Sequence, residues 1–305
     1  MYETKEIEAK YNDFIEAATK EIKPSREKIG SSVEKIIEET ECYVKEAGLE
    51  SLVIGVSGGL DSAVVAAIAR KVCDNLNIKL IGLSIPLSSS FDHREKANFV
   101  GNKYCDSFKE MVEWEEGSNV HNQVNEVIES TNDVIEESGF DSSKFNNKVA
   151  QGNIKARLRM ISLYRVAGVS NGAVLSTDNY SEYFLGFWTL QGDVGDISPI
   201  QFVGKGIEEI EMAKFLGIRE DIISQKPSDG LNVSDEDTDE AQLGMSYQEV
   251  DPIMFAYMGM LSEENIKKYN EIKSVEKVKN IIKRHEKTAF KRNGPFYVQR
   301  ERTGL

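Results

Sequence analysis

Short runs of consecutive apolar residues recur along the first two thirds of the chain, separated by longer segments in which apolar residues return every three or four positions. Unbroken apolar runs are typical of strands buried on both faces of a parallel sheet, whereas the spaced pattern is typical of helices that cover such a sheet. We expect four strands, at residues 51–56, 79–85, 108–112 and 172–176. Helices are expected directly after the first strand, over 92–104 and over 152–169. The alternation predicts an α/β fold with a doubly wound, Rossmann-like parallel sheet flanked by helices, which binds ligands beyond the carboxyl ends of its strands.

Two stretches outside the expected strands permit helices, one at the N-terminus and one in the middle of the chain. Residues 1–48 carry apolar residues at helical intervals and are interrupted near Pro24. Residues 115–146 are polar, but their valines permit a helix, followed by a mobile loop around Gly139. We therefore expect a single domain in three parts: an N-terminal helical segment (1–48), an α/β core (49–260) and a basic C-terminal helix and tail (261–305).

Charge is distributed unevenly along the chain. The net charge is −14, yet residues 267–302 hold twelve Lys or Arg against four Glu, a net +8, which leaves −22 on the rest. An acidic chain repels a phosphate backbone, so no nucleic-acid partner is expected. The basic C-terminal helix is either a solvated face or a contact for an acidic surface or an anionic substrate.

The sequence gives no sign of a membrane segment or of a metal cluster. No apolar run approaches the roughly 20 residues that cross a bilayer, and the N-terminus lacks a signal pattern. We therefore expect a cytoplasmic protein with no membrane partner. Its cysteines and histidines are few and lack the spacing of a disulfide framework or a ligand set; they are Cys42, Cys73, Cys105, His93, His121 and His285.

The sequence Ser57-Gly58-Gly59-Leu60-Asp61-Ser62 lies between the first expected strand and its helix. Two adjacent glycines permit the close backbone approach of a phosphate-binding turn, and the amide groups of the following helix start favour an anion. Ser57 and Ser62 add hydroxyl donors. Because a carboxylate repels phosphates unless it holds a cation, Asp61 indicates Mg²⁺ bridging to a triphosphate. The alternative is an ordinary strand-to-helix connection, with Asp61 favoured at the helix start by its charge.

Three further stretches carry polar residues in positions that suit a binding site. Residues 152–160, G-N-I-K-A-R-L-R-M, form one of the expected helices, whose arginines could also be simply solvated. Residues 176–193, S-T-D-N-Y-S-E-Y-F-L-G-F-W-T-L-Q-G-D, follow the fourth strand and should therefore project at its carboxyl end. Lys226-Pro-Ser and the acidic segment 238–247 come later, and their alternative interpretation is a plain surface loop.

The S-G-G-x-D-S string resembles the pyrophosphate-binding loop of the N-type ATP pyrophosphatases. With the three later stretches in the same order over residues 51–251, the chain resembles the ammonia-dependent NAD synthetases. The resemblance implies an adenine nucleotide alpha hydrolase-like fold and a ligase that amidates nicotinic acid adenine dinucleotide with ammonia. ATP supplies the driving force through an acyl-adenylate, with release of AMP and pyrophosphate. It further implies a homodimer with substrate bound partly across the interface, and the short segment 1–45 leaves no room for a glutaminase domain.

The resemblance also assigns roles to individual residues. Ser57, Gly58, Gly59 and Ser62 would bind pyrophosphate. Lys226 would stabilise charge on that leaving group, and Asp61 with Glu182 would hold Mg²⁺. Thr177 would lie beside ATP. Asn153, Arg157 and Asp193 would lie near the dinucleotide, and Asp193 could orient or deprotonate ammonium. The helix 152–169 would form the dimer contact through apolar residues that exceed one core-facing stripe, namely Leu158, Ile161, Leu163 and Tyr164.

The chain departs from the family pattern at four places. Ser176 stands where the family usually has Gly, and the turn 193–196 is one residue shorter than usual. The residues after Lys226-Pro-Ser read Asp229-Gly-Leu, and Phe290 stands where a His is more common. These departures affect the expected roles of Asp196, Asp229 and Phe290.

Two other functions share parts of this pattern. A GMP synthetase or a tRNA-thiolating enzyme would have the same 57–62 loop, but not the later stretches. A non-enzymatic nucleotide-binding module could share the α/β core. It would have no need for both Asp61 and Glu182, because it does not hold a leaving group through Mg²⁺.

Overall fold

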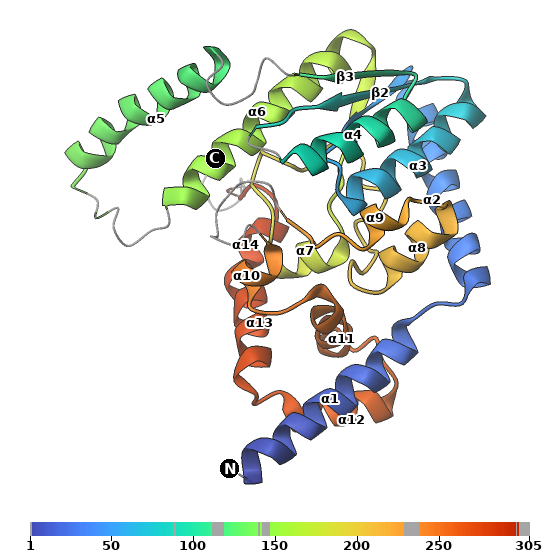
Figure 1. The fold of residues 1–305 in the computed structure, drawn as a ribbon, viewed down its shortest axis with the longest axis vertical. Helices are drawn as coiled ribbons and strands as arrows, with labels where there is room; N and C mark the ends of the chain where they lie inside the picture. Colours follow the sequence, from blue (N-terminus) through green and yellow to red (C-terminus); the bar gives the residue numbers. More distant parts are fainter. Residues whose placement is uncertain are drawn as a thin grey trace.

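The computed structural model describes residues 2–87, 90–111, 119–139, 141, 147–228, 238–296 and 298. Its centre is a parallel sheet of four strands: β1 (Ser51–Gly55), β2 (Lys79–Ser84), β3 (Ser107–Glu110) and β4 (Gly172–Leu175). They lie in the order β3-β2-β1-β4, so β1 pairs with β2 on one side and with β4 on the other. Figure 1 shows helices on both faces of the sheet. The doubly wound fold and the four expected strands are confirmed.

Alternation along β1 builds a separate core on each face of the sheet. Leu52 and Ile54 face the larger core, which they share with α2 (Arg26–Ala47), α3 (Leu60–Leu76), α4 (Phe91–Tyr104), α8 (Glu208–Leu216) and α9 (Glu220–Ile223). Val53 faces the opposite side, where it packs with Met160 and Leu163 of α6 (Asn147–Val169). Helix α5 (Asn119–Glu137), which follows β3 along the chain, projects away from the body of the molecule (Figure 1).

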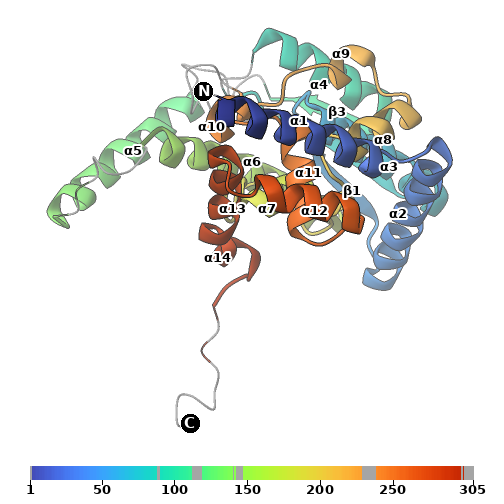
Figure 2. The same ribbon diagram turned by 90° about the horizontal axis from the view of Figure 1, so that it is seen from below.

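The other helices form a second lobe with its own core. They are α1 (Tyr2–Ile22), α7 (Tyr180–Leu185), α10 (Asp239–Leu243), α11 (Tyr247–Tyr257), α12 (Glu263–Ile272), α13 (Glu276–Lys287) and α14 (Ala289–Arg292). Figure 2 shows α1 lying along α12 and beside α11. Phe14 of α1, Phe184 of α7 and Met254 of α11 are fully buried in this core. The break expected near Pro24 is confirmed, and it sends α1 to one lobe and α2 to the other.

Two expectations about helices are wrong. The basic C-terminal segment is not one helix: the described part forms α12, α13 and α14, which are separated by short breaks. Leu163 is also not a candidate surface contact, because it is only 4% exposed and its side chain packs against Gly55 of β1. Ile161 and Tyr164 of the same helix are exposed. Within the described residues, no helix combines the length and the apolar character needed to cross a membrane.

We expect Leu163→Asp to lower the free energy of unfolding by about 4 kcal/mol or more, because it buries an unpaired carboxylate between α6 and the sheet. Arg165→Asp is the matched control, since it places the same side chain at an exposed position of the same helix. The control should change the unfolding free energy by less than about 1 kcal/mol. Chemical denaturation measures both, and equal stability of the two variants would contradict the position of Leu163.

Candidate active site

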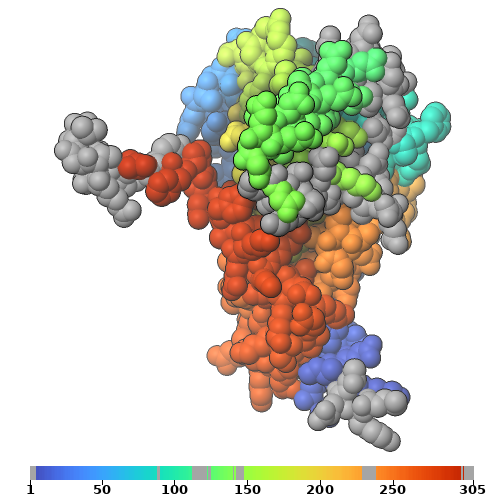
Figure 3. Space-filling model, turned by 90° about the vertical axis from the view of Figure 1, so that its left-hand side faces the viewer, coloured from blue at the N-terminus to red at the C-terminus, as the bar shows by residue number. Residues whose placement is uncertain are grey.

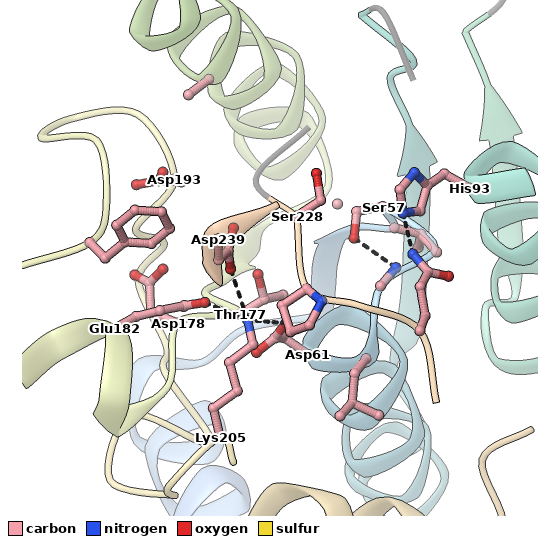
Figure 4. A pocket seen from close by; sticks show the side chains of 18 of the residues that line it. Ser57, Asp61, His93, Thr177, Asp178, Glu182, Asp193, Lys205, Ser228 and Asp239 are labelled. Atoms are coloured by element: carbon pink, nitrogen blue, oxygen red, sulfur yellow. Dashed lines mark hydrogen bonds and ion pairs between the residues drawn. The ribbon is translucent and has the colours of Figure 1, made fainter. Parts of the chain in front are cut away.

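A pocket opens at the point where the strand order of the parallel sheet reverses. From β1 the chain continues to β2 on one side, and β4 lies on the other, so the carboxyl ends of β1 and β4 flank the switch point at which open α/β sheets bind ligands. The pocket wall combines the turn after β1, the segment after β4 and the segment that precedes α10. It contains Ser57, Asp61, Thr177, Glu182, Asp193 and Lys226, so most of the predicted site residues are brought together (Figure 4).

The turn between β1 and α3 has the geometry of a phosphate-binding loop. Ser57 Oγ accepts a hydrogen bond from Gly59 N at 3.2 Å and lies 3.1 Å from Ser62 Oγ. Gly58 has φ of +87°, and a Cβ atom there would lie 2.1 Å from the carbonyl oxygen of His93. No side chain caps the start of α3 at Gly59. The first amide groups of α3 therefore suit an anion, and Gly58 allows α4 to pack directly against the turn.

A buried lysine that the sequence analysis did not identify joins three carboxyl groups. Lys205 Nζ lies 2.6 Å from Glu182 Oε1, 3.1 Å from Asp61 Oδ2 and 3.9 Å from Asp239 Oδ2. The three carboxyls belong to α7, α3 and α10, and Lys205 precedes α8. Asn179 orders the same group, because its Nδ2 donates to Asp61 Oδ1 at 2.7 Å while its Oδ1 caps the start of α7.

The helical lobe fixes the backbone around Lys205. Asp251 of α11 accepts hydrogen bonds from Gly206 N at 2.9 Å and Ile207 N at 3.1 Å. Its other oxygen accepts from Ser181 Oγ, which in turn accepts from Lys205 N at 2.9 Å. Asp251 is fully buried, and burial raises its pKa to about 7 despite these donors.

Burial leaves the cluster around Lys205 with more acidic groups than it can hold ionised. Burial raises the pKa of Glu182 to about 8, although Lys205 lowers it. Burial also raises the pKa of the nearby Glu209 carboxyl well above its ordinary value, and the charge of Asp61 raises it further. Burial lowers the pKa of Lys205, but Asp61 and Glu182 outweigh that effect and raise it overall. The ligand-free pocket therefore favours protons, and equally an added cation, beside these carboxyls.

The segment after β4 supplies a second acidic group. Asp193 accepts hydrogen bonds from Thr189 N with both carboxylate oxygens, at 2.9 and 3.0 Å. Burial raises its pKa to about 6. Asp178, next to Thr177, is also buried, and burial together with the charge of Asp193 raises its pKa well above the ordinary value.

Four predicted residues are not part of the pocket wall: Gly58 and Ser62 of the turn after β1, and Asn153 and Arg157 of α6. Asn153 Oδ1 accepts a hydrogen bond from Thr189 Oγ1 at 2.6 Å, and the exposed Arg157 donates to the carbonyl of Leu190 at 3.1 Å. Both therefore hold the turn that carries Asp193. Arg159 of the same helix does line the pocket.

The structure also locates two of the residues at which the chain departs from the expected pattern. Asp196 accepts hydrogen bonds from Tyr164 Oη at 2.8 Å and Val174 N at 2.9 Å, so it ties α6 to β4. Phe290 is exposed. Asp229 and the two residues after it lie outside the described residues.

Lys205 was missed because nothing in its local sequence marks it as buried. The one available signal is that Lys205 is a single lysine in the otherwise apolar and glycine-containing segment F-V-G-K-G-I, which directly precedes α8. His93, which also lines the pocket, was set aside because it lacks the spacing of a metal ligand.

We expect Lys205→Met to destabilise the protein by about 3 kcal/mol or more, because the partly buried carboxyls of Asp61 and Glu182 lose their cation. The loss should grow with pH. A carboxyl whose pKa is higher in the folded than in the unfolded protein takes up a proton on folding, so the free energy of unfolding falls as pH rises between the two values. For Glu182 this window runs from 4.5 to about 8, and removing Lys205 extends it upward. Urea unfolding at pH 6 and pH 8 measures both effects.

Lys214→Met is the matched control on the neighbouring helix α8. Lys214 is exposed, and its Nζ lies 3.0 Å from the surface carboxylate of Glu211. Its loss should change stability by less than about 1 kcal/mol at either pH. If Lys205→Met were as stable as the wild type at pH 8, the buried cluster would not depend on its lysine.

Comparison with known proteins identifies the family of the chain. The NAD synthase family model matches residues 32–295. The NH(3)-dependent NAD(+) synthetase of Alkaliphilus oremlandii is 33% identical over 227 residues, which is 74% of this chain and 85% of the relative. That of Thermoplasma volcanium is 32% identical over 274 residues, or 88% of this chain and 95% of the relative.

Solved structures share the fold. The NMN synthetase of Francisella tularensis superimposes with a TM-score of 0.66 at 25% identity, over 89% of this chain and 98% of that one. The NH3-dependent NAD synthetase of Campylobacter jejuni, in complex with nitrate, has a TM-score of 0.66 at 24% identity, over 90% of this chain and all of that one, and so supports the fold. The family model and the curated relatives together cover most of the sequence, and this chain belongs to the NAD synthase family.

Proposed function

We propose that the pocket between β1 and β4 is where this chain amidates nicotinic acid adenine dinucleotide. As a member of its family, the chain is a ligase that uses ATP and ammonia to form NAD⁺. The observation that carries the placement is that Asp61 and Glu182, from two separate elements, meet on one cation beside the phosphate-binding turn.

The chemistry explains why such a pocket is needed. A carboxylate is a poor acyl donor, so the nicotinate carboxylate must first attack the α-phosphate of ATP. That step forms an acyl-adenylate and breaks the bond to pyrophosphate. Ammonia then attacks the acyl carbon, AMP leaves, and the extra proton is lost to a base. No covalent enzyme intermediate is required, so the protein contributes by positioning two anions and stabilising charge on the leaving groups.

The phosphate-binding turn and Lys226 are suited to the first step. Ser57 and the amide groups at the start of α3 would bind the pyrophosphate portion of ATP, with Thr177 next to the nucleotide. Ser62 is buried and would support this turn through its contact with Ser57 Oγ. Lys226 is an exposed cation on the pocket wall, so it would meet the charge that develops on departing pyrophosphate.

The donor set beside the turn suits Mg²⁺ as part of a complex with ATP. Within the described part of the chain, no three His, Cys, Asp or Glu side chains make a metal site by themselves. Mg²⁺ prefers oxygen ligands and is commonly held by one or two carboxylates together with phosphates and water. Asp61 and Glu182 fit that requirement, since both line the pocket. Bound there, the ion would neutralise charge on the ATP phosphates.

The turn that carries Asp193 would serve the second substrate. Burial raises the pKa of the Asp193 carboxyl to about 6. This brings Asp193 closer to the range in which a side chain can accept a proton near neutral pH. Asp193 would then orient ammonium or take the proton that ammonia releases. Asn153 and Arg157 hold the same turn through Thr189 and Leu190, which would place them near the dinucleotide.

Homodimer formation is supported by the apolar side chains that this chain leaves exposed. Figure 3 shows α5 on the outer face of the molecule. A helix with little contact to its own chain is marginal in water unless another surface covers it. Exposed apolar residues occur on both α5 and α6: Val127, Val134, Ile135, Val149, Ile161 and Val169. A second copy of the chain would cover them.

A cytoplasmic location is supported by the cysteines. Cys42, Cys73 and Cys105 are all free thiols, and Cys42 is exposed. Free thiols are typical of proteins from reducing compartments.

We expect the purified protein to form NAD⁺, AMP and pyrophosphate in equal amounts from nicotinic acid adenine dinucleotide, Mg-ATP and ammonium. Asp61→Asn should lower single-turnover AMP formation at least about 100-fold, because a neutral amide is a far weaker ligand for Mg²⁺. The fold should survive, since the substitution is nearly isosteric, the amide oxygen can still accept from Asn179 or from Lys205, and Glu182 keeps its contact with Lys205. Quenched-flow measurement of AMP, with circular dichroism as the check on folding, tests both statements.

Asp106→Asn is the control, because Asp106 pairs with Arg70 at 2.7 Å on the surface of α3 and is not in the pocket wall. Its AMP formation should match the wild type. Near-normal rates in Asp61→Asn would exclude the metal role. Faster amidation of the corresponding mononucleotide than of the dinucleotide would exclude the proposed substrate.

For the homodimer, we expect Ile161→Asp to produce a folded monomer, because it places a carboxylate on the exposed apolar side of α6, where Ile161 is 64% exposed. Sedimentation velocity and ammonia-dependent activity are measured on the same sample. A folded monomer with low activity would support a substrate site completed by the partner, whereas full activity in the monomer would contradict it. A variant that stays dimeric would place the interface elsewhere.

A further inference from the structure

The first two turns of α4 contact Gln225, the residue that precedes Lys226. Lys96 Nζ donates to Gln225 Oε1 at 2.6 Å and to Asp92 Oδ2 at 2.5 Å. Gln225 also contacts His93 Nε2 through its amide nitrogen (Figure 4). Lys96 is only 5% exposed, so its ammonium depends on these two acceptors for hydrogen bonds. We call this group, Asp92, Lys96, Gln225 and His93, the α4 latch.

The donors and acceptors of the α4 latch define one arrangement. An ammonium can only donate, so the oxygen of the Gln225 amide must face Lys96 and its NH₂ group must face His93. An NH₂ group in turn only donates, so His93 Nε2 is the acceptor and the ring proton lies on Nδ1. Ser90 Oγ lies 3.1 Å from Nδ1 and accepts a hydrogen bond from that N–H group. The same oxygen caps the start of α4 by accepting from the backbone amide of His93. Each group in the chain therefore fixes the orientation of the next.

The same turns of α4 touch the phosphate-binding loop. A Cβ atom at Gly58 would lie 2.1 Å from the His93 carbonyl oxygen and 3.1 Å from Ala97 N, so the two backbones are in direct contact. His93 and Ser57 lie on the same side of the pocket (Figure 4). One helical turn thus contacts both the loop expected to bind pyrophosphate and the segment that carries Lys226.

Lys226 has little backbone freedom between its two neighbours. Gln225 is held by α4, and Pro227 has a fixed φ and disfavours helical conformations of the residue before it. The Pro227 carbonyl accepts a hydrogen bond from Asp239 N at 3.0 Å, which ties the segment to α10. The position of the Lys226 backbone in the pocket therefore depends on the contacts of Gln225 and Pro227.

We propose that Gln225 is a positioning residue: through the α4 latch it sets the distance between Lys226 and the phosphate-binding turn. This inference rests on the proposed role of Lys226 in stabilising departing pyrophosphate. The latch acts on the transition state, because the charge that Lys226 meets develops as the pyrophosphate leaves. Gln225 itself makes no contact with the reacting atoms in this role.

The test is a double-mutant cycle between Gln225→Met and Lys226→Met. Methionine has a similar length but cannot hold Lys96 or His93. Gln225→Met should lower kcat about tenfold and change KM for Mg-ATP less than about threefold, since displacement of a catalytic group mainly affects the transition state. Lys226→Met should lower kcat about 100-fold. The double variant should match Lys226→Met, because Gln225 acts only through that lysine.

Ser224→Ala is the matched control, because Ser224 adjoins Gln225 and its hydroxyl donates to the carbonyl of Glu220 at the start of α9 rather than to α4. It should keep the wild-type kcat. If Gln225→Met fails to fold, Lys96→Met replaces it, since this change removes the donor that orients the Gln225 amide. Its kcat should fall in the same direction, again with little effect once Lys226 is replaced.

The outcomes separate the two ideas. Impaired Lys226→Met with a fully active Gln225→Met would overturn the latch and leave the role of Lys226 intact. A fully active Lys226→Met would overturn the role of Lys226, and the latch with it. Losses that multiply in the double variant would show that Gln225 acts independently of Lys226, which also contradicts the proposal.

Discussion

The buried contact between the Lys205 ammonium and three carboxyl groups is the constraint on which the pocket depends. An ammonium with so little access to water is stable only if acidic groups surround it, and these come from three different helices. The contact therefore fixes α3, α7 and α10 relative to one another. It also keeps Asp61 and Glu182 close together, which under the proposed function would reduce the reorganisation needed to bind ATP.

The two lobes divide the work of building this site. The sheet and its helices provide the turn at the end of β1, while the helical lobe supplies Asp251, which holds the backbone after Lys205 directly and the Lys205 amide through Ser181. The pocket lies where the two lobes meet. Each wall is anchored in a hydrophobic core of its own, which lets the polar groups between them remain partly exposed without loosening the fold.

Local sequence predicted the parts of the structure that depend on local order. Apolar runs marked β1, β2 and β4, because a strand buried on both faces needs few polar residues, and Gly58 marked a turn that only glycine can form. The helical lobe was not predicted, because it depends on contacts between distant parts of the chain. Tyr11, for example, donates a hydrogen bond to Glu249, which is 238 positions away. Lys205 was missed for a similar reason. Whether a lysine is buried depends on carboxylates that arrive from elsewhere in the chain, and no pattern around residue 205 records them.

The packing of α1 against α12 has a consequence for how the protein is made. Glu21, near the end of α1, accepts hydrogen bonds from Ser262 and Asn265 at the start of α12. Because α12 lies much later in the chain, α1 leaves the ribosome long before the helix that covers it has been synthesised. Among the described residues, the sheet core contains none beyond Ile223, so it can form on the nascent chain. During translation the apolar side of α1, with Tyr11 and Phe14, stays uncovered. The growing chain therefore carries a phosphate-binding turn for some time before it has a complete pocket.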